Sequence, residues 1–165
     1  MRLDVGCGNR PTGDINVDLF MNEETRHVDL NKCLLVDAKK IPNPIKADAN
    51  HLPFKDGTFE EVYCAHVLEH LENPTKGLLE LIRVSKDKVV VILPHRYHFA
   101  HKTAVKIGVH KHTFSATSVI EWLKKLELPC LYSVTTIYKP KFFSTIIPLI
   151  QFPYEICIEI KKAWK

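Results

Sequence analysis

The chain has 165 residues, of which 45% are hydrophobic, with a formal net charge of +4 and a pI near 8.8. We expect a single domain over residues 1–165, because this length supports one substantial core and leaves no room for a second. The charge is mildly basic, and no run of Lys or Arg is longer than two. Nucleic-acid binding is therefore not indicated.

The five cysteines are odd in number, widely scattered and form no Cys-x-x-Cys pair. This usage is typical of reduced thiols in an intracellular protein, so we expect a cytoplasmic location and no disulfide framework. No signal peptide precedes the first expected strand, which starts almost at Met1.

The first nine residues after Met1, RLDVGCGNR, predict an apolar strand that runs straight into a Gly-x-Gly turn. Glycines at positions 6 and 8 let the backbone turn sharply and come close to a ligand that a side chain would push away. The pattern favours a loop that handles a nucleotide, and we expect the ligand to carry an adenosine.

Two acids follow in the order that a ribose and an adenine would need. Asp18 ends a second short strand, where its carboxylate could accept both ribose hydroxyl hydrogens. Asp48 precedes Ala49 and the apolar segment 52–54, so it could accept from the adenine amino group while its neighbours pack on the ring. Either acid alone would more often be a turn or capping residue.

A strand at 59–64 then leads into the segment Val67-Leu68-Glu69-His70-Leu71. With these motifs in order, the first half of the chain resembles a class I methyltransferase of the type-11 group, which uses S-adenosylmethionine (SAM). The resemblance implies an α/β fold with a doubly wound, mostly parallel seven-stranded Rossmann-like sheet and an antiparallel last strand. It also implies the residues around SAM: Asp4, Gly6 and Gly8 at the methionine end with Cys7 between them, Asp18 at the ribose with Leu19 beside it, Asp48 and Ala49 at the adenine, and His66 on the methyl side.

The remaining elements alternate between helix and strand, as expected for a layered α/β domain. The apolar run 89–93 is typical of a strand buried on both faces. Ser115 or Ser118 could cap the helix that follows, the latter with Glu121 as a capping box. We also expect a helix over 74–86 and two final strands at 131–138 and 154–160.

The chain departs from the family near its N-terminus. Only six residues separate Gly8 from Ile15, so the helix that usually follows the first strand has no place, and no helix precedes that strand. One sheet face should be left partly uncovered. We expect residues 21–46, a homo-oligomer interface, or both to cover it.

Nine histidines are present. Two spacings could in principle place imidazoles around zinc: His95-x-x-His98-x-x-His101 and His110-x-His112. Histidines at such steps, without cysteine or carboxylate partners, are not a firm signature, so we expect no metal ion. Methyl transfer needs mainly in-line placement of the acceptor, and a base only for a protonated acceptor. The competing interpretation of the histidines is that residues 94–114 form the acceptor-side loop, with histidines available as proton acceptors. His66 and His112 are the candidate bases.

The apolar stretch 141–153 is interrupted by prolines and is shorter than the roughly 20 residues that cross a bilayer. It could be ordinary core, a lid over the substrate pocket, a subunit interface or a membrane contact. For the acceptor we favour a small molecule, with RNA or protein as the alternative. A non-catalytic SAM-binding partner module is the alternative of another class. A nicotinamide-binding domain is disfavoured, because the third glycine is absent and the acid follows too early.

Overall fold

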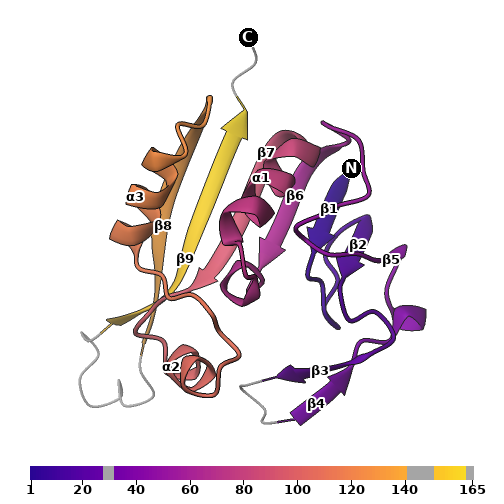
Figure 1. The fold of residues 1–165 in the computed structure, drawn as a ribbon, viewed down its shortest axis with the longest axis horizontal. Helices are drawn as coiled ribbons and strands as arrows, with labels where there is room; N and C mark the ends of the chain where they lie inside the picture. The colour runs from indigo at the N-terminus through magenta and orange to yellow at the C-terminus, as the bar shows by residue number, and fades with distance from the viewer. Residues whose placement is uncertain (28–31, 141–150, 163–165) are drawn as a thin grey trace.

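A computed structural model describes residues 1–27, 32–140 and 151–162 of the chain (Figure 1). Its centre is a seven-stranded sheet of order β5-β2-β1-β6-β7-β9-β8. The first five strands in this order are parallel, and β9 runs antiparallel to both neighbours. The predicted sheet with an antiparallel last strand is confirmed. The strands are β1 (Arg2–Val5), β2 (Ile15–Asp18), β5 (Pro44–Lys46), β6 (Phe59–Ala65), β7 (Ser85–Pro94), β8 (Cys130–Pro140) and β9 (Gln151–Lys162).

Two helices, α1 (Pro74–Val84) and α3 (Ala116–Lys125), cover one face of the sheet. Their apolar residues join the alternate residues of β6, β7 and β9 in a single core cluster. Only alternate residues of each strand join this cluster, because successive side chains of a strand point to opposite faces of the sheet. Asn73 caps α1 by accepting from the backbone of Lys76, and Ser115 caps α3 in a capping box with Ser118. Of the two candidate caps, Ser115 is therefore the N-cap.

The opposite face carries no helix within the described residues, as the short connection after Gly8 predicts. This connection runs back along β1, and Asp14 donates its backbone N–H to the Arg2 carbonyl at 2.9 Å. On this face the Arg2 guanidinium stacks over the Tyr63 ring, 4.6 Å from its centroid. None of the described helices is long and apolar enough to cross a membrane.

The described residues of 21–46, which are 21–27 and 32–46, do not lie over this face. They form the hairpin β3 (Glu24–His27) and β4 (Lys32–Leu35), the short helix η2 (Ala38–Lys40) and the edge strand β5. Figure 1 shows the hairpin beyond the carboxyl ends of β1 and β2. The reason is a small separate core there, made by Cys7, Met21, Val36 and Ile41.

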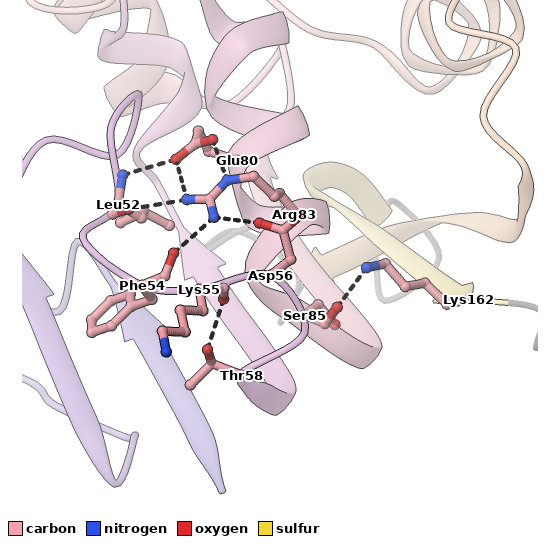
Figure 2. Close-up of polar contacts among 9 residues, drawn as sticks. All are labelled: Leu52, Phe54, Lys55, Asp56, Thr58, Glu80, Arg83, Ser85 and Lys162. Carbon is pink, nitrogen blue, oxygen red and sulfur yellow. Dashed lines mark hydrogen bonds and ion pairs between the residues drawn. The ribbon is translucent and has the colours of Figure 1, made fainter.

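Arg83, near the end of α1, holds the segment after β5 in place (Figure 2). Its guanidinium donates to the backbone carbonyls of Leu52 and Phe54 at 3.0 and 2.7 Å. It also donates to Glu80 at 2.6 Å and Asp56 at 2.8 Å. Charge-assisted bonds of this kind are stronger than neutral ones, so this network fixes the segment that carries the expected adenine-binding residues.

The parallel strands all end at the same edge of the sheet, which is the lower edge in Figure 1. Two further helices lie near that edge: η3 (Leu68–His70) after β6 and α2 (Phe99–Lys106) after β7. Ligands of open α/β sheets bind outside the carboxyl ends of the strands, where the strand order reverses. Here the order reverses between β1 and β6. Residues 141–150 of the apolar stretch lie outside the described residues.

Candidate active site

A cavity of about 610 Å³ opens at the carboxyl ends of β1, β2 and β6. One half is lined by the loops after β1, β2 and β5, and the other by η3, α2 and the loop after α2. This size is typical of pockets that enclose small molecules. Of the nine residues expected around the cofactor, seven line it: Gly6, Gly8, Asp18, Leu19, Asp48, Ala49 and His66.

The glycine loop has the backbone that its sequence predicts. Gly6 and Gly8 have φ of +75° and +49°, in the left-handed region that favours glycine. A Cβ on Gly6 would lie 2.0 Å from Cγ2 of Val67, so the loop packs directly on the segment after β6. A Cβ on Gly8 would meet no atom within 4 Å, so this position faces open space.

Asp18 holds the two ends of this loop region together. Its Oδ2 accepts from the Gly8 backbone N–H and its Oδ1 from the Phe20 N–H, both at 2.9 Å. The residue is 8% exposed, and it lines the cavity. Each carboxylate oxygen has a second lone pair, so the carboxylate can still accept from a ligand hydroxyl.

Asp48 and Ala49 also line the cavity, and they lie in the segment that Arg83 holds. Oδ1 of Asp48 accepts from the Asn50 backbone N–H at 2.8 Å. Desolvation raises the pKa of Asp48, but the hydrogen bonds from Asn50 and His51 outweigh it, and the net pKa is lowered. Asp48 is therefore ionised at neutral pH and can accept from an amino group, while Ala49 is buried and apolar beside it.

Asp4 and Cys7 do not line the cavity, in contrast to the expectation for them. Oδ2 of Asp4 accepts from the backbone N–H and the hydroxyl of Thr12, both at 2.8 Å. These bonds hold the helix-free connection between β1 and β2 against β1. Burial raises the pKa of Asp4. Cys7 packs into the small core with Met21, and burial raises its pKa to about 12.

His66, at the end of β6, has a positive φ of +56°, which is uncommon for a residue with a side chain. Its Nε2 lies 3.1 Å from Oε1 of Glu155 and its Nδ1 lies 3.6 Å from Oε1 of Glu69. Burial lowers the pKa of His66, but these two carboxylates raise it to about 9. The imidazole is therefore protonated at neutral pH and donates, whereas a general base must accept a proton.

His112, the second candidate base, is half-buried and does not line the cavity. Its Nε2 lies 3.0 Å from the Leu71 backbone carbonyl, which can only accept, so this nitrogen carries the hydrogen. The residue fastens its loop to η3. The neighbouring His110 faces the cavity instead.

The second half of the cavity is lined by residues beyond those expected around the cofactor, three of them histidines of the segment 94–114: Glu69, His70, His98, His101, His110, Tyr154 and Glu155. Burial lowers the pKa of His110 to about 4, so this imidazole is neutral. The Glu69-His70 dipeptide directly after a strand that ends at the ligand edge is the signal that could have found the first two members. The remaining members come from later segments that only the fold brings here.

The cavity wall is acidic. Its four carboxylates, those of Asp18, Asp48, Glu69 and Glu155, outnumber the positive charges of Lys111 and of the protonated His66 among the described lining residues. Like charges in one cavity favour a ligand of opposite sign. A cationic ligand such as a sulfonium fits this wall.

Comparison with known proteins agrees with this geometry. The chain is 38% identical over 91 residues to an uncharacterized protein of Methanocaldococcus jannaschii, a match over 55% of this chain and 38% of that protein. The chain thus spans well under half the length of this curated relative.

Solved structures share the fold over nearly the whole chain. A SAM-dependent methyltransferase of Thermotoga maritima matches with a TM-score of 0.66 and 17% identity, covering 98% of this chain and 82% of that one. One from Mesorhizobium loti has a TM-score of 0.63 and 12% identity, covering 98% and 90%. Magnesium protoporphyrin IX methyltransferase from Synechocystis, with bound S-adenosylhomocysteine (SAH), has a TM-score of 0.57 and 14% identity, covering 98% and 74%.

A family model described as a methyltransferase domain, type 11, matches residues 3–93, which is more than half of the chain. The chain belongs to this methyltransferase domain family.

Proposed function

We propose that the protein transfers a methyl group from SAM to a small-molecule acceptor in this cavity. The observation that carries the proposal is the placement of Gly8, Asp18 and Asp48 on one half of the cavity, opposite the histidine-rich half. When bound, SAM supplies a methyl group on a sulfonium, which is already a good leaving group. The residues of this chain then have to bind, orient and exclude water.

The described residues fit SAM by three independent features. Gly8 leaves open space where a side chain would stand. Asp18 keeps free lone pairs for ribose hydroxyls, and its backbone bonds hold it in one orientation. The four wall carboxylates favour the sulfonium charge.

A small acceptor is supported by the enclosed cavity and by the acidic wall, which would repel a phosphate backbone. His66 serves this function better as a charged donor than as a base, because its pKa is raised to about 9. Its hydrogen bond with Glu155 and its 3.6 Å ion pair with Glu69 join the segment after β6 to β9.

The test is methyl transfer from radiolabelled SAM, first to a library of hydroxyl- and amine-bearing metabolites and then to total RNA and a protein lysate. We expect label in the metabolite fraction. Label only in RNA or protein would contradict the small-molecule acceptor. SAH binding with no turnover on any acceptor would favour a non-catalytic SAM-binding module.

A further inference from the structure

The acceptor-side half of the cavity contains a buried carboxylate with no hydrogen-bond partner in the described part of the chain. Glu69 is fully buried, and both of its carboxylate oxygens lack such a partner. Three histidine nitrogens surround Oε1 beyond ordinary hydrogen-bond distance: Nδ1 of His66 at 3.6 Å, Nε2 of His70 at 3.8 Å and Nε2 of His110 at 4.0 Å. The protonated His66 compensates part of the Glu69 charge, and both oxygens keep lone pairs that a further cation can use.

The second nitrogen of His70 determines what its Nε2 can do. Nδ1 of His70 lies 2.9 Å from the backbone carbonyl of Val109. A carbonyl only accepts, so Nδ1 carries the hydrogen, and in the neutral ring Nε2 presents a lone pair towards Glu69. Histidines that bind metals almost always donate their other ring N–H in this way.

His110 has the same arrangement through a different partner. Its Nδ1 lies 2.7 Å from Nδ1 of His101, and Nε2 of His101 lies 3.4 Å from the Thr113 hydroxyl. If His110 donates to His101 and His101 donates to Thr113, every contact is satisfied and Nε2 of His110 keeps its lone pair. The reverse order would point an N–H of His110 at Glu69 across 4.0 Å, beyond hydrogen-bond range.

From this geometry we propose that Glu69, His70 and His110 form a binding site for one divalent transition-metal ion of the zinc type. One ligand atom from each of the three lies within 4.8 Å of the others. Ligand atoms bound at about 2.1 Å in a tetrahedral site lie about 3.4 Å apart, so the widest pair has to close by up to about 1.4 Å. Two imidazoles and one carboxylate suit Zn²⁺ and leave a coordination position open.

The proposed metal site also indicates the class of acceptor. This inference rests on the methyl transfer proposed above. The three ligands line the same cavity as His66, on the side opposite the glycine loop. A metal ion lowers the pKa of a hydroxyl bound at its open position. The acceptor is then an alcohol or phenol: its O–H proton leaves to water, the oxygen forms the new C–O bond, and the C–S electron pair stays on the sulfur of SAH.

The first experiment uses Zn²⁺ alone as the probe. Chelator-treated full-length protein is titrated with Zn²⁺ by calorimetry, and bound metal is counted by elemental analysis. We expect one ion per chain. Glu69→Gln and His110→Ala should each weaken Zn²⁺ binding by at least tenfold, whereas His51→Ala, an exposed histidine outside the cluster, should leave the affinity unchanged.

Co²⁺ supplies a spectroscopic readout that does not depend on activity. Its visible absorption should report a site with nitrogen and oxygen ligands in the wild type and change in His110→Ala. Thermal unfolding accompanies each variant, and if Glu69→Gln does not fold, His110→Ala and His70→Ala decide. Absence of stoichiometric binding to the folded wild type, or equal binding by the folded ligand variants, would overturn the site.

SAH titration of the same samples separates the two proposals. SAH binding without Zn²⁺ binding removes the metal site and leaves the methyl-transfer proposal standing. Zn²⁺ binding that depends on the three ligands, without SAH binding, supports the metal site and removes its role in methyl transfer.

Discussion

Nε2 of His66 lies 3.1 Å from Oε1 of Glu155, although 89 positions separate the two residues in the sequence. The pair joins the end of β6 to β9, the antiparallel strand that lies between β7 and β8. Burial lowers the pKa of His66, but Glu155 and Glu69 together raise it to about 9. Two consequences can be measured.

We expect NMR titration of metal-free protein to show His66 protonated through neutral pH, with a pKa near 9 instead of 6.5. Because the folded-state pKa is the higher one, the pair's stabilisation is complete below pH 6.5 and is lost as the pH rises through about 9. Glu155→Gln should lower the pKa of His66 and flatten this dependence. A wild-type His66 that titrates near 6.5 would contradict the pairing.

The glycine loop offers a matched pair of substitutions. Gly8 and Gly108 both have positive φ, and a Cβ on either would meet no atom within 4 Å. Alanine at each should therefore cost a similar amount, about 1–2 kcal/mol in the free energy of unfolding. Only Gly8 lines the cavity, so only Gly8→Ala should weaken SAH binding, by tenfold or more. Equal SAH affinity of the two variants would place the cofactor elsewhere.

Gly6→Ala should be more harmful to folding. The new Cβ would lie 2.0 Å from Cγ2 of Val67, in addition to the left-handed backbone cost. We expect a lower melting temperature than for Gly8→Ala, measured by circular dichroism. Equal melting temperatures of Gly6→Ala and Gly8→Ala would show that the loop does not pack on Val67 as described.

The Arg83 network in Figure 2 predicts a stability effect that reaches the cavity. Arg83→Ala removes bonds to two backbone carbonyls and to Glu80 and Asp56. Because the side chain is 29% exposed, we expect a loss of about 1–3 kcal/mol in the free energy of unfolding by urea denaturation. SAH affinity should fall as well, since the network holds the Asp48 segment. Lys55→Ala, an exposed neighbour, is the control and should change neither.

The strands and helices of the sheet were predictable because their patterns are local. The apolar run at 89–93 became the centre of β7, and the apolar spacing after Pro74 became α1, which ends at Val84. Helix α2 was not predicted. Its buried residues include the polar His101 as well as Ala104, so its sequence lacks the apolar spacing that indicates a helix.

The residues expected around the cofactor follow successive strands that end at one edge, and seven of the nine line the cavity. Asp4 and Cys7 were exceptions, because their side chains turn to Thr12 and to the small core. The sequence placed the histidines of 94–114 in one loop, but it did not predict the meeting of His110 with Glu69, because the two are brought together only by the loop after α2. The choice of His112 missed the cavity-facing His110 by two positions.

The central claim is that the Asp18 side of the cavity binds SAM. The most direct test is calorimetric titration of the purified protein with SAH, alongside Asp18→Ala and the exposed control Asp87→Ala, each checked for folding by circular dichroism. We expect micromolar binding by the wild type and by Asp87→Ala, and none by folded Asp18→Ala. No SAH binding by folded wild type, or undiminished binding by Asp18→Ala, would contradict the account.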